Sequence, residues 1–313
     1  MYHYVRDLQH SHHPKLKALD VKLFERQIRY LKKKFSIVKM EEVIDAIIKQ
    51  NALPENAALL TFDDGYSDHF NHVFPLLRDQ DIQGSFFPSG KATKENCVLD
   101  VNKIQFTLAS APENEILQTL LEHIETYRKD HALASKEEYW KKYAIANRFD
   151  TAEVVFIKSM LQKGLDAPLR KKIADALFKK YVSKKEEQFA KELYLSASQI
   201  KLMKKEGMFI GSHGYEHCWL GTLSEEQQKE EIKKSLQFLE ELGCSENWVM
   251  CYPYGSQNAS LIRLLASSGC RAGLTVELGV ADLKFNNPFR LPRIDTTDVL
   301  KEMAGFQAAN IYK

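Results

Sequence analysis

Two adjacent acids, Asp63 and Asp64, follow an apolar segment at residues 57–62 and precede Gly65. An apolar run that stops at polar residues and a glycine is typical of the carboxyl end of a buried parallel strand. Ligands bind at that end in α/β proteins, because the loops vary there while the strands hold them rigidly. Neighbouring residues that leave a strand point in different directions, so one carboxylate can bind a metal while the other acts as a base. The alternative is that one of the acids only caps the helix predicted over residues 66–78.

Two histidines, His213 and His217, come directly after a second apolar strand near residues 207–211. Their spacing of four places both imidazoles on one side of a helical turn, close enough to bind one ion. Two histidines and one carboxylate leave an open position on a tetrahedral zinc ion, as in catalytic rather than structural sites. We therefore predict that an acid of the doublet and both histidines form a site for zinc or another divalent cation.

A third predicted strand, over residues 248–252, ends in the turn Pro253-Tyr254-Gly255. Proline restricts φ in this turn, and the glycine permits a sharp bend. We expect the backbone N–H groups that follow Pro253 to point into the site, where they would hold an oxyanion.

Three motifs occur in a fixed order: Thr-Phe-Asp-Asp-Gly at 61–65, Ser-His-x-x-x-His at 212–217 and Tyr-Pro-Tyr-Gly at 252–255. Together they resemble the motifs of the polysaccharide deacetylase family, the NodB-type carbohydrate esterases of family 4. The resemblance covers residues 1–90 and about 196–300. It implies an α/β fold, a deformed (β/α)7-type barrel, and removal of N-acetyl groups from amino sugars with one divalent metal, usually zinc.

The resemblance also implies a role for each motif residue. The first acid of the doublet, Asp63, corresponds to the general base, and the second, Asp64, to a metal ligand beside His213 and His217. The metal would lower the pKa of a water and polarise the amide carbonyl. The N–H of Tyr254 would stabilise the oxyanion together with the metal, and Tyr254 is therefore a candidate catalytic residue.

One departure from the family concerns the proton for the leaving amine. Family members often carry a further histidine on a late strand, whereas this chain has no histidine after His217. We expect His3, on the first strand, to replace it, with Glu277 and a proton relayed from Asp63 as alternatives. His3 can also be read as a hydrogen-bonded histidine at the tip of a strand.

Three charged residues near the last predicted strand have two open interpretations. Arg290, Arg293 and Asp295 lie at residues 289–295 and would either orient Asp63 or the substrate, or form an ion pair that closes the barrel.

Alternating strands and helices predict parallel β/α units over residues 1–90 and 196–313. Residues 91–195 show helical periodicity almost throughout, which predicts an inserted helical subdomain. Because this segment leaves a strand's carboxyl end, we expect it to overhang the site and narrow access to it. The alternative is that this segment forms an oligomer interface. In that case the protein would be a homo-oligomer.

The composition restricts the class of partner. The chain has 313 residues, a net charge of +2 and a pI near 8.1, which gives no strong field for a nucleic acid polymer or an anionic membrane. Five scattered cysteines without a C-x-x-C pair indicate free thiols in a reducing compartment. No segment reads as a membrane span or a leader peptide, so we expect a cytoplasmic protein; a leader missing from the sequence would overturn that expectation.

These observations lead to a functional expectation. We expect metal-dependent hydrolysis of the N-acyl amide, acetyl or formyl, of an amino sugar. The expected substrate is a nucleotide-linked or lipid-linked intermediate of surface-glycan biosynthesis. The alternatives are a non-catalytic carbohydrate-binding protein, suggested by the missing histidine, and an amidase that acts on a small non-sugar amide. An intact Asp63 argues against the binding protein, since binding alone needs no base.

Overall fold

The computed structural model describes residues 1–147 and 150–311, with side chains described to residue 303. The chain divides into two compact units. The first comprises Met1–Asp7, Ala18–Asn96 and Lys191–Lys313, and the second comprises Leu8–Lys17 and Cys97–Ala190. Within the part of the chain that is described, no helix combines the length and apolar character needed to cross a membrane.

The first unit is built on short parallel strands. Pairing joins β5 to β6 and β6 to β7, and it also joins β8 to β9 and β9 to β10. These strands are β5 (Thr61–Asp64), β6 (Ser85–Pro88), β7 (Phe209–Ile210), β8 (Met250–Cys251), β9 (Gly273–Leu278) and β10 (Leu291–Arg293). Two smaller parallel pairs lie beside them, β1 (Val5–Arg6) with β2 (Leu19–Asp20) and β3 (Ser36–Ile37) with β4 (Ala57–Ala58).

Single bridges close these strands into a ring. Tyr2 pairs in parallel with Phe62 of β5, and Ser212, after β7, pairs with Met250 of β8. The N–H of Thr296, after β10, donates to the carbonyl of Met1 at 3.2 Å. The order around the ring is therefore the N-terminal segment, β5, β6, β7, β8, β9 and β10, which is the deformed barrel that the motifs imply.

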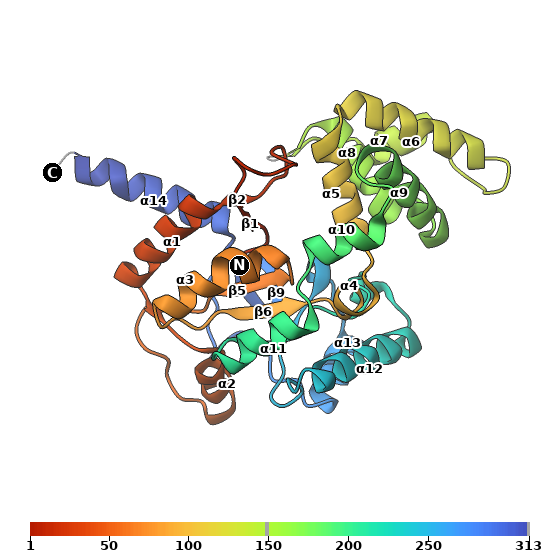
Figure 1. The fold of residues 1–313 in the computed structure, drawn as a ribbon. Helices are drawn as coiled ribbons and strands as arrows, with labels where there is room; N and C mark the ends of the chain where they lie inside the picture. The colour runs from red at the N-terminus through yellow and green to blue at the C-terminus, as the bar shows by residue number, and fades with distance from the viewer. Residues whose placement is uncertain (148–149, 312–313) are drawn as a thin grey trace. The chain divides into compact units, whose positions relative to one another are not determined.

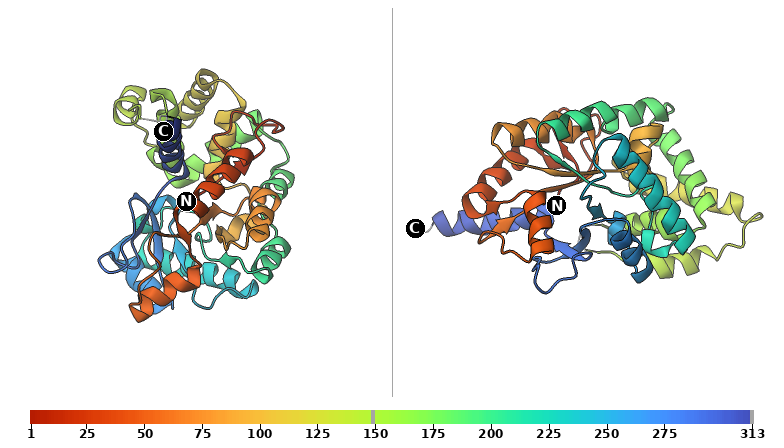
Figure 2. Two further views of the ribbon diagram at one scale, coloured as in Figure 1. Left: turned by 90° about the vertical axis from the view of Figure 1, so that its left-hand side faces the viewer. Right: turned by 90° about the horizontal axis from the view of Figure 1, so that it is seen from below.

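Helices surround the strands of this unit in both views of Figure 2. They are α1 (Val21–Lys34), α2 (Met40–Lys49), α3 (Phe74–Asp79), α4 (Gly90–Glu95), α11 (Ala197–Lys205), α12 (Glu225–Glu241), α13 (Ala259–Ser267) and α14 (Thr296–Ile311). Local sequence signals set several of the helix starts. The Asp20 carboxylate accepts from the N–H of Lys22 at the start of α1, and Ser224 and Gln227 form the capping box of α12.

Two sequence-based element boundaries differ from the structure. The apolar run at residues 57–62 does not form one strand, because Ala57 and Ala58 pair with β3 and the chain pairs with β6 only from Thr61. The helix predicted over residues 66–78 begins as the π-helix η1 (His69–Val73) and continues as α3. Both differences reflect tertiary pairing that an apolar pattern does not encode.

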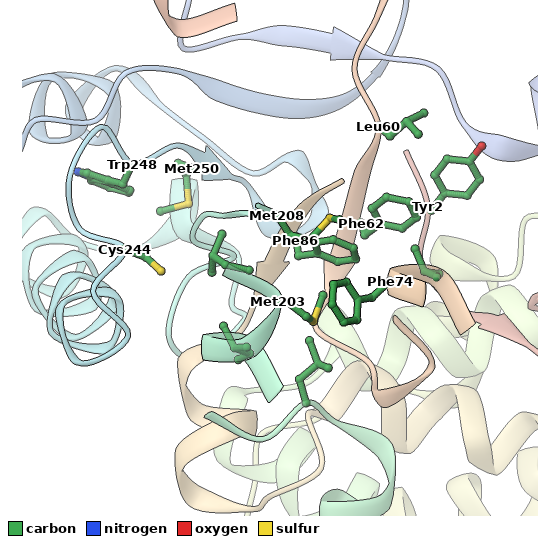
Figure 3. Packing of buried hydrophobic residues seen from close by; sticks show 14 of the residues in the cluster. Tyr2, Leu60, Phe62, Phe74, Phe86, Met203, Met208, Cys244, Trp248 and Met250 are labelled. Atoms are coloured by element: carbon green, nitrogen blue, oxygen red, sulfur yellow. The ribbon is translucent and has the colours of Figure 1, made fainter. Parts of the chain in front are cut away.

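The barrel core is rich in stacked aromatic rings (Figure 3). Phe62 of β5 lies between two stacked rings. Its ring centroid is 4.8 Å from that of Phe86 of β6 and 5.0 Å from that of Tyr2. Each such pair contributes about 0.5–1.5 kcal/mol beyond the area it buries. This packing holds β5, and therefore the acid doublet at its end, against the N-terminal segment.

The second unit is helical and has a hydrophobic core of its own (Figure 1, yellow to green). Its helices are α5 (Asp100–Ser110), α6 (Glu113–Tyr127), α7 (Lys136–Tyr143), α8 (Ala152–Ser159), the π-helix η2 (Met160–Gly164), α9 (Ala167–Tyr181) and most of α10 (Glu186–Leu193). Its core side chains come from α5, α6, α8, η2 and α9 and include Ile116, Phe156 and Ile173, each fully buried.

A buried lysine connects three helices of this unit. Lys103 of α5 is 1% exposed, and its Nζ contacts Asp175 of α9 and, at 2.8 Å, Glu186 of α10. Burial alone would lower the pKa of Lys103, but the two carboxylates outweigh burial and raise it. The lysine therefore stays charged and holds α10 to α5 and α9.

We expect Lys103→Met to lower the free energy of unfolding by about 1–3 kcal/mol, less than the 3–5 kcal/mol typical of a broken, fully buried ion pair. The loss is smaller because Asp175 and Glu186 are 38% and 37% exposed and can be hydrated. Urea unfolding measures the change. Lys171→Met is the matched control, since Lys171 also contacts Asp175 but is 58% exposed. Equal losses in the two variants would contradict a special role for Lys103.

Candidate functional site

The structure brings Asp64, His213 and His217 together. The Nε2 atoms of His213 and His217 lie 3.2 and 3.1 Å from Asp64 Oδ1. All three residues are buried, and their donor atoms lie within 4.8 Å of one another. Three residues from two strand ends that lie far apart in sequence therefore surround one point.

Left-handed backbone conformations aim these side chains. Asp64 leaves β5 at φ 71° and Gly65 follows at φ 70°, so the chain turns sharply at the end of the strand. The prediction of a helical turn at the histidines is wrong. Residues 213–217 form an irregular loop in which Gly214 has φ 71° and His217 has φ 54°. The loop, not a helix face, places the two imidazoles side by side.

The hydrogen bonds of Asp64 exclude the helix-capping alternative. The Tyr66 hydroxyl donates to Asp64 Oδ2 at 2.6 Å, while Oδ1 faces the two imidazoles and has no hydrogen-bond partner in the described chain. Burial and the neighbouring carboxylate raise the pKa of Tyr66, which therefore remains a donor. One oxygen of Asp64 is held by protein, and the other is left for the centre of the site.

The protons on His213 support a cation site. His213 Nδ1 lies 2.7 Å from the carbonyl oxygen of Cys251, to which it donates. In the neutral imidazole, which is the form that binds a metal, Nε2 then carries a lone pair that faces Asp64 Oδ1. Lone pairs that converge without a proton repel one another unless a cation lies between them. Two imidazole nitrogens and a carboxylate oxygen are donors that suit zinc and other divalent first-row metals.

The pKa values of these groups agree with competition between protons and a cation. Burial would raise the pKa of Asp64, but the adjacent imidazoles of His213 and His217 hold it well below its ordinary value. Burial lowers the pKa of His217. Burial would also lower the pKa of His213, but Cys251 and Asp64 outweigh burial and raise it. A proton on His213 in the metal-free protein occupies the position that a bound metal would take.

The first acid of the doublet, Asp63, has a different partner. Arg293 Nη1 and Nη2 donate to Asp63 Oδ1 and Oδ2 at 2.9 and 2.7 Å, and Arg293 Nε donates to the carbonyl of Thr275 at 2.7 Å. Burial would raise the pKa of Asp63, but the guanidinium outweighs burial and holds the pKa below its ordinary value. Asp63 is therefore an ionised, oriented carboxylate beside the candidate metal ligands.

The contacts of Arg293 answer the question left open for the last strand. Arg293 both orients Asp63 and ties β10 to β5, so the two interpretations describe one interaction. Arg290 is exposed, and Asp295 accepts from the N–H of Thr297 at the start of α14.

A second set of donors, Asp63, His213 and Cys251, also lies within 4.8 Å. The positively charged guanidinium of Arg293 already donates to both oxygens of Asp63. His213 Nδ1 is already used to donate to the Cys251 carbonyl. A cation at this second position would face the guanidinium, so we assign no metal to it.

The two side-chain candidates for the general acid differ in position. His3 Nε2 lies 3.8 Å from Asp63 Oδ2, and the His3 side chain is 41% exposed. The carbonyl of His3 accepts from His69 Nε2 at 2.8 Å, so His3 is also anchored as a strand-tip residue. Glu277 is exposed on β9, and its described hydrogen bond runs from its own N–H to Thr275 Oγ1. The structure brings His3, and not Glu277, to Asp63.

Tyr254 forms a wall beside His217. It has φ 57°, stacks on Trp219 with ring centroids 4.4 Å apart, and meets His217 edge-on at 5.0 Å. The N–H groups of Gly255 and Ser256 donate within the turn, to Tyr252 and Pro253. The expectation that the N–H groups after Pro253 point into the site is therefore wrong for these two. An oxyanion contact at Tyr254 N–H stays a prediction from the resemblance.

Sequence reasoning missed two polar residues that hold the ligands. Tyr66 was read only as the start of a helix, and its contact with Asp64 depends on the turn at Gly65. Glu231 of α12 is 4% exposed and accepts from the N–H groups of Tyr215 and Glu216 in the histidine loop. A signal was present for Glu231, because it lies next to Ile232 on the buried face of an amphipathic helix.

Comparisons with known proteins agree with this geometry. A family model described as "Polysaccharide deacetylase" matches residues 50–273. The Bacillus subtilis (strain 168) protein named "Putative polysaccharide deacetylase YxkH" is 28% identical over 88 residues, 28% of this chain. The match spans 32% of that protein, about a third of its length.

Solved structures share the fold at low sequence identity. The Streptococcus pyogenes deacetylase PplD in complex with acetate superposes with a TM-score of 0.58 at 18% identity, covering 94% of this chain and 89% of that one. IcaB from Ammonifex degensii gives a TM-score of 0.56 at 18% identity, covering 97% and 93%. The deformed (β/α) barrel predicted from the sequence is confirmed. Because the family model matches more than half of the chain, the protein belongs to the polysaccharide deacetylase family.

Proposed function

We propose that the protein hydrolyses the N-acyl amide of an amino sugar, with acetyl or formyl as the acyl group. The observation that carries the proposal is a buried carboxylate, Asp63, held by both arms of Arg293 beside the donor set of Asp64, His213 and His217. Binding a sugar does not require such a base. Membership of the polysaccharide deacetylase family and the acetate in the similar PplD structure support the same reaction class.

The finer substrate assignment rests on the sequence. We propose a nucleotide-linked or lipid-linked amino sugar of surface-glycan biosynthesis as the substrate and the cytoplasm as the compartment. The five cysteines are all free thiols, which agrees with a reducing compartment.

The chain's own residues divide the reaction between them. Asp64, His213 and His217 would hold a divalent cation, which supplies Lewis acidity to the amide carbonyl and acidifies the attacking water. Asp63 accepts the proton that the water loses as its oxygen bonds to the amide carbon. Arg293 keeps both oxygens of Asp63 oriented for this transfer.

Breakdown of the tetrahedral intermediate requires a second proton transfer. The C–N bond breaks, and the leaving nitrogen takes a proton and becomes the amine of the sugar. We assign this proton to His3, whose Nε2 atom lies 3.8 Å from Asp63 Oδ2. The acyl group leaves as a carboxylate, acetate or formate.

We expect His3→Ala to lower kcat by at least about 100-fold, since a general acid contributes roughly 10²–10⁴ in rate. The hydrogen bond from His69 goes to the backbone carbonyl of His3 and survives in this variant, so the loss reports on the imidazole. The measurement is kcat at saturating substrate. Glu277→Gln is the matched comparison and should retain nearly full activity. A large loss in Glu277→Gln with normal turnover in His3→Ala would transfer the role to Glu277.

The proposed function is tested by product release. Metal-loaded protein is incubated with nucleotide-linked N-acetyl and N-formyl amino sugars, their lipid-linked counterparts and N-acetylated glycan polymers, and acetate and formate are quantified. We expect release from a conjugated monosaccharide, with release by Asp63→Asn slowed by about 10²- to 10⁴-fold. Metal and sugar binding without any acid released from the whole panel would contradict the proposal and favour the non-catalytic alternative.

A further inference from the structure

The three proposed metal ligands are oriented in different ways. Asp64 receives a hydrogen bond from Tyr66, and His213 donates to the carbonyl of Cys251. Outer partners of this kind hold a ligand in the direction that a metal requires. His217 differs, because its buried Nδ1 finds no hydrogen-bond partner elsewhere in the described chain. Its imidazole is therefore aimed by the backbone that carries it and by ring packing against Tyr254, with no hydrogen bond from an outer partner among the described residues.

That backbone is held by Glu231. The Glu231 Oε1 atom accepts from the N–H of Tyr215 at 2.7 Å and from the N–H of Glu216 at 2.8 Å. These are consecutive amides between the two histidines. A Cβ added at Gly214 would lie 3.2 Å from the same oxygen, so the carboxylate packs directly against the loop.

Two further hydrogen bonds hold the loop. Ser212 Oγ accepts from the N–H of Gly214 at 3.1 Å, and Ser89 Oγ donates to the Tyr215 carbonyl at 2.7 Å. Glu231 thus supplies the acceptor for two partly buried amides. Leaving a fully buried amide without a partner costs about 1–3 kcal/mol, which is an upper bound for each of these.

The conformation of His217 explains why this anchoring matters. A non-glycine residue at φ 54° occupies a sparsely populated region and keeps it only when the surroundings over-determine it. The two bonds from Glu231 end one residue before His217, at Glu216. Releasing them would let the loop relax and move His217 Nε2 away from Asp64 Oδ1, 3.1 Å distant.

We propose that Glu231 is the positioning residue of the metal centre: by holding the amides of Tyr215 and Glu216, it aims His217 and thereby sets the affinity for the divalent cation. This inference rests on the proposed metal site. It assigns to a helix residue outside the three motifs a role in metal binding.

The test is a titration of metal-free protein with Zn²⁺ against a chromophoric chelator, independent of any substrate. Glu231→Ala should weaken Zn²⁺ binding about 10- to 100-fold, the usual cost of removing an outer partner. Glu231→Gln keeps an oxygen at the same reach and should bind nearly as tightly as the wild type. Ser235→Ala, which removes a buried hydroxyl that donates to the Glu231 carbonyl, is the matched control and should leave affinity unchanged.

The readouts separate positioning from general stability. Thermal unfolding of each metal-free variant shows whether it is folded, and Co²⁺ absorption shows whether coordination changes. If Glu231→Ala does not fold, Glu231→Asp replaces it, because its shorter side chain retracts the acceptor. Unchanged Zn²⁺ affinity in folded Glu231→Ala, or in Glu231→Asp where that variant replaces it, would overturn the inference. An equal loss of Zn²⁺ affinity in Glu231→Gln would also overturn it. Absence of Zn²⁺ binding by the wild type would instead overturn the proposed metal site itself.

Discussion

Replacing Asp63 with asparagine is expected to lower kcat for amide hydrolysis by about 10²- to 10⁴-fold, the usual contribution of a general base. Asparagine has nearly the same size as aspartate but cannot take a proton from water. Its amide oxygen can still accept one of the two bonds from Arg293, so the fold of the site should survive. Because Asp63 is not among the three proposed ligands, the variant should still bind its metal.

The measurement combines kcat with elemental analysis of the purified variant. Arg293→Lys is the informative control, since it keeps Asp63 and a positive charge but loses the two-pronged contact. We expect it to reduce kcat less than Asp63→Asn does. Near-normal turnover by a metal-loaded Asp63→Asn variant would remove Asp63 as the base.

His213→Ala is expected to abolish tight metal binding and, with it, hydrolysis. The substitution removes one of three donors and leaves Asp64 Oδ1 facing His217 alone. It also removes the imidazole N–H that donates to the buried carbonyl of Cys251. Elemental analysis should find about one divalent ion per wild-type chain, as expected for a single three-donor catalytic site, and little in the variant.

A histidine in the helical unit provides the control for this result. His123 of α6 stacks on Tyr127 and is not among the site residues, so His123→Ala should keep the wild-type metal content. Equal metal content in the wild type and His213→Ala would show that Asp64, His213 and His217 are not the ligands.

Local signals in the sequence were sufficient for many elements. Asp20 and Ser224 cap their helices, and such caps can be read from the sequence because a capping side chain bonds to amides only two or three residues away. The end of β5 at the acid doublet was also foreseen, since the apolar run and Gly65 both mark it. Such features depend on neighbours in the chain and are therefore readable without tertiary contacts.

The loop that carries the histidines shows where this reasoning stops. The spacing of His213 and His217 is compatible with a helix. The loop is instead held by Glu231, 15 and 16 positions from the amides it binds, and by Ser89, 126 positions from Tyr215. These tertiary hydrogen bonds to the backbone of the loop outweigh a weak local preference for helix.

By itself, the sequence determined which residue types stand at the strand ends. Their order along the chain carries the resemblance to the family, and the resemblance implies the barrel. Only the tertiary structure decided how these residues are paired. Arg293 reaches Asp63 across 230 positions because the ring closes between β10 and the N-terminal segment, and the same closure brings His3 rather than Glu277 to the base. Pairings of this kind arise from closure of the whole chain, which no local pattern encodes.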